Sequence, residues 1–294
     1  MISFAKAHAC GNDFLIVTEE AAAGYDKAEL AIRLCERNTG IGADGVEFFT
    51  WTGPTSGRIR LHNADGSIAE ISGNGTRCVA AWMAEEIDAL VGDVLTIETD
   101  AGIRACTLRD IRVRDMDGPT WLVTTDMDVP EFEEQTVELA DGTAIDGVFV
   151  SMGNPHFVIL LDSITLQDTD REDSNPSALD FSIGDRSWQE IGEEICFLPD
   201  FPDQTNVEFL RILPTPNSAV NQVALRIFER GVGPTTSSGT GTSAAATAMI
   251  GVYQASSPLE VVAPGGIQTV EWAGDGENLF LTGPATLLCR GEAW

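Results

Sequence analysis

Short apolar runs separated by turn residues dominate the hydrophobic pattern of this chain. The runs are rich in β-branched and aromatic residues, a composition that predicts strands rather than helices. The predicted strands cover residues 14–18, 46–50, 58–62, 94–98, 104–108, 120–125, 148–151, 157–161, 206–213, 223–229, 260–262, 267–272, 279–282 and 286–290. The pattern therefore predicts a protein built mainly from β-sheet.

Helical patterns are confined to a few segments, of which residues 26–35, 75–86 and 241–251 are the best and 187–194 is a shorter candidate. The second and third are rich in alanine, and each follows a Ser-Gly-X-Gly-Thr turn. One helix can bury the apolar surface that several curved strands provide. We therefore expect an α/β (α+β) fold in which curved, mainly antiparallel sheets or barrels each surround a central helix.

The two serine turns belong to an internal duplication. The segment that runs from Ser72 to Met83 returns 166 residues later from Ser238 to Met249, with six of twelve positions identical. Residues 11–17 likewise resemble 153–160, and 95–103 resemble 259–267, in the same order along the chain. A long period with collinear blocks indicates two homologous domains rather than a solenoid. We expect pseudo-symmetric domains at 1–120, with 280–294 returning to it, and at 121–279.

Each serine turn is a predicted anion seat. A glycine-rich turn that opens a helix presents backbone N–H groups and the positive end of the helix dipole, which favour a carboxylate. Two such seats suggest one shared site, with Ser72 and Ser238 approaching a small anionic ligand from opposite sides. The alternative is that the small residues serve only tight turns and close packing, and the duplication makes this alternative less attractive.

Charge and cysteine usage narrow the classes of partner. The chain carries 46 acidic and 17 basic residues, a net charge of −29, which disfavours nucleic-acid and membrane partners. The acidic residues concentrate between 109 and 203, where we expect solvated surface and long loops.

Six cysteines without C-x-x-C pairs predict reduced thiols, with no metal site. No apolar run reaches the length of a membrane span and no signal peptide begins the chain, so we expect a soluble cytoplasmic protein.

Seven motif blocks together resemble the diaminopimelate epimerase family over nearly the whole chain. The blocks are Ala9-Cys-Gly-Asn-Asp-Phe14, Gly40-Ile-Gly-Ala-Asp-Gly45, Asn63-Ala-Asp-Gly-Ser67, Ser72-Gly-Asn-Gly-Thr-Arg-Cys78, Gly153-Asn-Pro-His156, Asn206-Val207, and Glu229-Arg-Gly231 followed by Ser238-Gly-Thr-Gly241. The resemblance implies two barrel-like domains and an isomerase that inverts an amino-acid α-carbon in lysine and cell-wall precursor synthesis. It also implies that no cofactor is used and that the partner is a small amino-acid substrate, while a homodimer is left open.

The resemblance assigns roles to individual positions. Gly73, Asn74, Gly239 and Thr240 would hold the α-carboxylate, and Glu229 would meet the reacting ammonium. The distal amino-acid end would be held by Asn12, Asn63, Asn154, Asn206 and Arg230, and His156 would lie close to the reacting centre. The alternative for each asparagine, taken singly, is a turn residue that bonds its own backbone.

The chain departs from the family at the two catalytic positions, where Ser72 and Ser238 replace a pair of opposed cysteines. A thiol at a helix N-terminus ionises near neutrality, whereas serine is a far weaker acid and needs an adjacent base. His62 is a second departure, and His62 or His156 could be that base. Three hypotheses follow: an epimerase of diaminopimelate, a related isomerase of another amino acid or small acid, or a non-catalytic amino-acid-binding protein.

Overall fold

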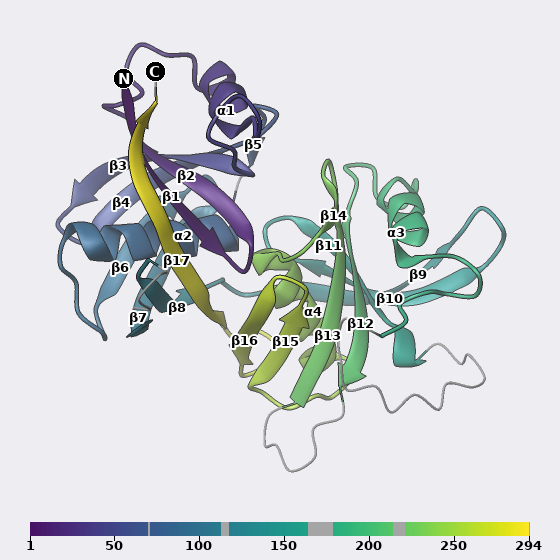
Figure 1. Ribbon diagram of the computed structural model, residues 1–294. Helices are drawn as coiled ribbons and strands as arrows, with labels where there is room; N and C mark the ends of the chain where they lie inside the picture. The colour runs from purple at the N-terminus through teal and green to yellow at the C-terminus, as the bar shows by residue number, and fades with distance from the viewer. Residues whose placement is uncertain (70, 113–117, 164–178, 214–220, 294) are drawn as a thin grey trace. The chain divides into compact units, whose positions relative to one another are not determined.

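The computed structural model describes residues 1–69, 71–112, 118–163, 179–213 and 221–293. The chain divides into unit 1, Met1–Asp126 with Thr282–Trp294, and unit 2, Met127–Leu281. The sequence places these boundaries a few residues earlier, at 120 and 280. Figure 1 shows that the last strand returns to the N-terminal strands of unit 1.

Unit 1 is a closed barrel of eight strands. The ring of paired strands runs β1, β2, β3, β4, β6, β7, β8, β17 and back to β1. The pairs β2–β3 and β4–β6 are parallel, and the other registers described are antiparallel. The strands are β1 (Ile2–Ala9), β2 (Asn12–Thr18), β3 (Gly45–Gly53), β4 (Ser56–Asn63), β6 (Val94–Thr99), β7 (Gly102–Arg112), β8 (Thr120–Asp126) and β17 (Leu279–Ala293), and the short β5 (Ile68–Ala69) pairs with β4.

Helix α2 (Gly73–Glu86) lies inside this barrel. Every residue from Gly73 to Ala84 is buried, and the helix packs against β1, β2, β6, β7 and β8. The alanines of β1 (Ala5, Ala7 and Ala9) face it, which leaves room for the helix within the ring. A helix that is apolar on all sides must be central, so the alanine-rich composition of this segment follows from its place in the barrel.

Helix α1 (Lys27–Cys35) covers the outside of the same barrel. Asp26 caps it by accepting a hydrogen bond from the N–H of Glu29, and its buried residues join a cluster with Leu15, Val46 and Phe48. Strands β2 and β3 thus have apolar contacts on both faces, toward α2 and toward α1. This double burial explains the unbroken hydrophobic run at residues 14–17.

Unit 2 repeats the plan around a second buried helix, α4 (Gly239–Gly251), which packs against β10–β13, β15 and β16. The paired strands run β9, β10, β11, β12, β13, β15 and β16, with β14 on β13, and the pairs β11–β12 and β13–β15 are parallel. Helix α3 (Trp188–Cys196) covers β12 and β13. The strands are β9 (Glu131–Glu138), β10 (Ala144–Ser151), β11 (Pro155–Leu160), β12 (Asn206–Leu213), β13 (Asn221–Glu229), β14 (Gly233–Thr235), β15 (Leu259–Ala263) and β16 (Gly266–Trp272), and a turn of 3₁₀ helix, η1 (Leu161–Ser163), follows β11.

The strand registers relate the two units residue by residue. Ile16 on β2 lies opposite Glu47 on β3, and Val158 on β11 lies opposite Glu208 on β12, in pairs that are parallel in both units. The hairpins β6–β7 and β15–β16 correspond as the sequence repeat predicted. Two residues earlier on β2 and β11, Phe14 of unit 1 corresponds to His156 of unit 2. The pairing of β3 with β4 and of β12 with β13 likewise makes Asn63 the counterpart of Glu229.

Three expectations about the strands need correction. The predicted runs at 279–282 and 286–290 form a single strand, β17, and β1 was missed because alanines occupy its buried side. Part of the acidic stretch expected as surface and loops is the strand β9, whose glutamates are exposed and whose Val137 is buried. The most acidic part of that stretch, within 164–178, lies outside the described residues.

In the described parts of the chain, no helix is long and apolar enough to cross a membrane.

Candidate functional site

The N-terminus of α2 forms the first predicted anion seat. Ser72 precedes the helix in an extended conformation, and its Oγ accepts a hydrogen bond from the N–H of Gly75 at 3.0 Å. Gly73 and Asn74 form the first turn and are buried. Because such a tip concentrates N–H groups and the positive helix dipole, it suits a ligand carboxylate.

A chain of side-chain hydrogen bonds joins this tip to β2. Asn74 donates from Nδ2 to Asn12 Oδ1 at 3.1 Å, and Asn12 donates from Nδ2 to Asp44 Oδ2 at 2.6 Å. Buried Arg77 donates to Asn74 Oδ1 from the other side, and Arg37 pairs with Asp44 at 2.7 Å. The structure therefore brings the predicted residues Asn12, Asn74 and Ser72 together at one end of the barrel.

The N-terminus of α4 forms the second seat in the same way. Ser238 is extended and accepts the N–H of Gly241 at 3.2 Å, while its Oγ lies 3.5 Å from Thr240 Oγ1. Gly239 and Thr240 form the buried first turn. Both serines are thus N-caps, as the duplicated turn predicted, and each cap bond contributes about 1 kcal/mol to helix stability.

Glu229 lies beside Ser238. The side chains of Ser238 and Thr235 donate hydrogen bonds to its carboxylate, the latter at 3.2 Å. Withdrawal from solvent raises the pKa of Glu229 to about 7, although these two hydrogen bonds work in the opposite direction. A carboxyl group that titrates near neutrality and touches a serine hydroxyl is suited to act as its general base.

His156 is buried and holds partners on both ring nitrogens. Nδ1 lies 2.7 Å from Glu208 Oε1, and Nε2 lies 3.0 Å from Asn154 Oδ1. Asn154 in turn donates from Nδ2 to Thr240 Oγ1 at 3.4 Å. His156 therefore reaches the seat around Ser238 through Asn154 and Thr240.

The other polar residues of the predicted set serve local turns and strand ends. Asn206 donates to the carbonyl of Pro155 at 3.0 Å and accepts the backbone N–H of Arg230 at 3.1 Å. Arg230 itself donates to the carbonyl of Asp203, and Asn63 donates to Ser67 Oγ at 3.0 Å. Asn206 thus joins backbone groups 51 and 24 residues away and Asn63 bonds a side chain, so neither makes the bond to its own backbone that the alternative describes.

Two buried carboxylates, Glu47 and Glu208, were missed in the sequence. Each lies in a Val-Glu-Phe triplet, at 46–48 and 207–209, where a single charged residue interrupts an apolar strand. This repeated triplet was the signal that could have found them. Both side chains are fully buried beside the first turn of a central helix, and burial raises the pKa of Glu47 to about 8.

His62 lies away from the helix tip. Its ring packs edge-on against Phe48, in the cluster under α1, and Nδ1 lies 3.2 Å from the carbonyl of Gly66. The neighbouring Leu61 instead faces α2. Since successive side chains of a strand point to opposite faces, the structure does not bring His62 together with Ser72.

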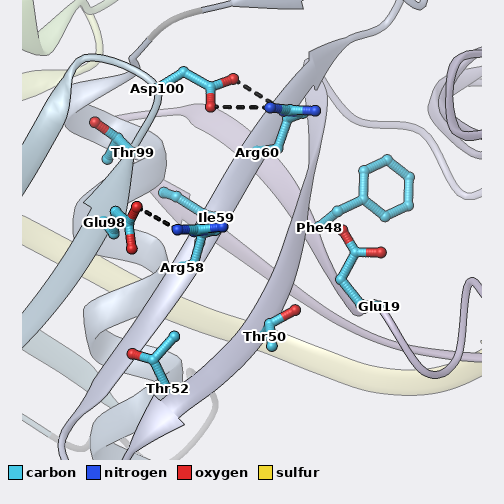
Figure 2. A pocket seen from close by; sticks show the side chains of 10 residues that line it. All are labelled: Glu19, Phe48, Thr50, Thr52, Arg58, Ile59, Arg60, Glu98, Thr99 and Asp100. Carbon is cyan, nitrogen blue, oxygen red and sulfur yellow. Dashed lines mark hydrogen bonds and ion pairs between the residues drawn. The ribbon is translucent and has the colours of Figure 1, made fainter.

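A cavity of about 460 Å³ lies elsewhere in unit 1, over β3, β4 and β6. Figure 2 shows that its walls carry two ion pairs, Arg58 with Glu98 and Arg60 with Asp100, together with threonine side chains. The arginines of this cavity are already paired with carboxylates, and none of the predicted site residues lies there. We therefore take the two helix N-termini, rather than this cavity, as the candidate site.

Among the described residues, no group of three or more histidine, cysteine, aspartate or glutamate side chains is arranged to hold a metal ion.

Comparison with known sequences follows the same residues. The family model described as diaminopimelate epimerase matches residues 4–123 and 148–288. A diaminopimelate epimerase of Parabacteroides distasonis is 33% identical over 293 residues, covering 99% of this chain and 97% of the relative. Another from Carboxydothermus hydrogenoformans is 33% identical over 300 residues, covering 99% of both.

Comparison with solved structures extends the fold beyond these relatives. A probable proline racemase from Agrobacterium radiobacter K84 superposes with a TM-score of 0.70 at 16% identity, covering 100% of this chain and 93% of its own. A Bacillus anthracis phenazine biosynthesis protein of the PhzF family superposes with a TM-score of 0.65 at 18% identity, covering 100% and 99%. At these identities the likeness concerns the fold alone.

Proposed function

This chain belongs to the diaminopimelate epimerase family, and we propose that it inverts one α-carbon of LL-diaminopimelate to give the meso form without a cofactor. The observation that carries the proposal is the pair of serine-capped tips on two central helices. They occur in a chain whose full-length relatives bear this name. An enzyme that inverts a carbon centre needs one acid–base group for each face of that carbon, and a duplicated tip supplies two.

The anion seats support recognition of the substrate. In the proposal, both turns act on one substrate molecule, and the first-turn N–H groups of Gly73, Asn74, Gly239 and Thr240 bind its α-carboxylate. Charge that develops on this carboxylate as the α-proton leaves is stabilised by the same fixed dipoles. The polar set Asn12, Asn63, Asn154, Asn206 and Arg230 would bind the distal amino-acid end, exchanging its present contacts for the ligand.

The base on one face is Ser238 assisted by Glu229. Above pH 7 the Glu229 carboxylate is ionised and accepts the proton of the Ser238 hydroxyl, while the Ser238 oxygen removes the α-proton. The carbanion is then protonated on its other face by the hydroxyl of Ser72, which regains a proton from solvent while Glu229 releases its proton to solvent. Proton count and charge balance over this cycle.

The two faces are unequal in this scheme. Ser238 has a carboxyl partner, whereas the described hydrogen bond of the Ser72 hydroxyl joins it to the backbone N–H of Gly75. An alcohol without a base is a much weaker acid than the thiol that the family carries. We therefore propose a slow epimerase whose protonation step at Ser72 limits turnover.

The experiment is incubation of the protein with LL-diaminopimelate in deuterium oxide. Chiral chromatography follows the meso product, and mass spectrometry follows deuterium at the α-carbon. We expect slow appearance of meso product that carries one deuteron, and no reaction with proline or 4-hydroxyproline. Turnover of another amino acid instead would establish the related isomerase, and tight calorimetric binding of diaminopimelate with no exchange would establish a binding protein.

A further inference from the structure

Glu208 and His156 form a fully buried pair in unit 2. Both side chains have no exposed surface, and Nδ1 of the ring lies 2.7 Å from Glu208 Oε1. Burial raises the pKa of Glu208, and the interaction with His156 offsets part of this effect. A buried carboxylate is retained only when a charged or donating partner satisfies it, so the imidazole and the carboxylate depend on each other.

The contacts of the ring indicate its protonation. Nδ1 faces a carboxyl oxygen of Glu208, which can donate when it carries a proton, and Nε2 faces the amide oxygen of Asn154 at 3.0 Å, which can only accept. Nε2 must therefore carry hydrogen, and one further proton lies between Nδ1 and Glu208. The function of the ring in this arrangement is to donate from Nε2.

The donation of His156 determines how Asn154 points. With its oxygen held by the ring, Asn154 must direct its NH₂ group away, and Nδ2 lies 3.4 Å from Thr240 Oγ1. Thr240 Oγ1 is in turn 3.5 Å from Ser238 Oγ. A continuous line of polar contacts thus runs from the core of the sheet to the cap of α4.

We propose that Glu208 is a positioning residue that holds the His156 ring with hydrogen on Nε2, so that Asn154 presents its amide N–H to the turn carrying Thr240 and Ser238. The inference rests on the proposed function for its effect on turnover, but its effects on His156 and on folding do not. Glu208 would act through His156 and Asn154, without touching the substrate.

Unit 1 contains the matched arrangement without the histidine. Glu47 holds the same place on β3 as Glu208 on β12, beside the glycine three residues after the capping serine. Phe14 stands where His156 stands in unit 2, and neither carboxyl oxygen of Glu47 has a hydrogen-bond partner among the described residues. Glu47 is therefore a buried carboxyl of the same kind that positions nothing, and it supplies the control.

The test compares Glu208→Leu with Glu47→Leu. Removing Glu208 leaves the His156 ring without its Nδ1 partner, so Glu208→Leu lowers the unfolding temperature, whereas Glu47→Leu removes an unpaired carboxyl and raises it. We expect kcat for diaminopimelate to fall about 100-fold in Glu208→Leu and to stay unchanged in Glu47→Leu. Glu208→Gln, which can still donate to Nδ1, should recover most of this loss.

The protonation of the His156 ring nitrogens is measured by ¹⁵N NMR of protein labelled at histidine. The variant His156→Phe identifies the signal of this ring among those of the three histidines. We expect hydrogen on Nε2 in the unaltered protein and in Glu208→Gln, and loss of this single tautomer in Glu208→Leu. The double variant Glu208→Leu, His156→Phe, which places at position 156 the phenylalanine that unit 1 carries as Phe14, should regain stability without regaining turnover.

The outcomes separate the two proposals. A His156 ring that keeps its hydrogen on Nε2 in Glu208→Leu, or an equal loss of turnover in Glu47→Leu, would overturn the positioning role. If the unaltered protein has no epimerase activity, the proposed function fails, while the ring signals and the opposite signs of the two stability changes still decide the role of Glu208.

Discussion

Glu47 and Glu208 lie at the same place in the two units, each with its carboxyl group against the glycine three residues after a capping serine. A Cβ atom on Gly75 would lie 2.1 Å from Glu47 Oε1, and one on Gly241 would lie 2.8 Å from Glu208 Oε1. A larger residue at either glycine would have to displace the carboxyl group of the neighbouring strand. The two carboxyls differ in their partners, since Glu208 has His156 and Glu47 has none.

The unpaired state of Glu47 predicts a pH-dependent stability. Burial raises the pKa of Glu47 to about 8, above the value of 4.5 for an ordinary glutamate. The stability that protonated Glu47 contributes is complete below pH 4.5, its pKa in the unfolded chain, and is lost as pH rises to about 8. The reason is that the unfolded chain releases this proton at a lower pH than the folded chain. Glu47→Gln should therefore raise the free energy of unfolding at pH 8 by a few kcal/mol, and by little at pH 5.

Urea unfolding between pH 5 and pH 9 measures this difference, with Glu131→Gln on the exposed side of β9 as the control. A Glu47→Gln gain that is the same at every pH would show that Glu47 is not protonated in the folded protein at neutral pH.

The pKa of Glu229 predicts the acid limb of the reaction. If the carboxylate of Glu229 assists Ser238, turnover rises with pH through about 7 as the group loses its proton. Glu229→Gln should lower kcat by about 100-fold or more and remove this limb. Glu47→Gln should leave this acid limb in place, although the pKa of the Glu47 carboxyl, about 8, is close to that of Glu229.

A pH–rate profile of the three proteins measures this effect. Persistence of the same limb in Glu229→Gln would mean that another group is the base.

The strong negative charge predicts that salt stabilises the fold. A net charge of −29 repels itself in the compact state. The screening length falls from about 10 Å at 0.1 M salt to about 3 Å at 1 M, so the unfolding temperature should rise by several degrees over this range. Calorimetry in potassium chloride measures the rise, and an equal osmolality of sucrose controls for solvent exclusion. An unfolding temperature that is flat or falls with salt would contradict the prediction.

Helices and most strands could be predicted from the sequence because the local sequence pattern of each segment agreed with its environment in the folded protein. The helices capped by Asp26, Ser72 and Ser238 each begin within two residues of the predicted start. Strand β1 was missed because its inward side is alanine, whose choice reflects the space taken by α2 rather than any β-propensity. Strand β9 was missed because exposed glutamates occupy both of its faces and leave Val137 as its one buried residue.

The site could be predicted as a set of residues but not as a network. The motif blocks identified both helix tips, Glu229 and Asn154, and the structure gathers these around Ser72 and Ser238 within each unit. The partner of His156 could not be deduced, since Glu208 is 52 residues away and meets the ring only through the parallel pairing of β11 and β12. That both tips act on one ligand stays a prediction.

Solvent-deuterium exchange in cysteine variants tests the central claim that both helix tips act on one α-carbon. The proteins are Ser72→Cys, Ser238→Cys and the double variant, with LL-diaminopimelate in deuterium oxide. Thiols at these tips ionise near neutrality, so we expect the double variant to form meso product about 100-fold faster than the unaltered protein. Each single variant should lie in between, with one deuteron at the inverted carbon. A folded double variant that binds diaminopimelate but exchanges no α-proton would contradict the account.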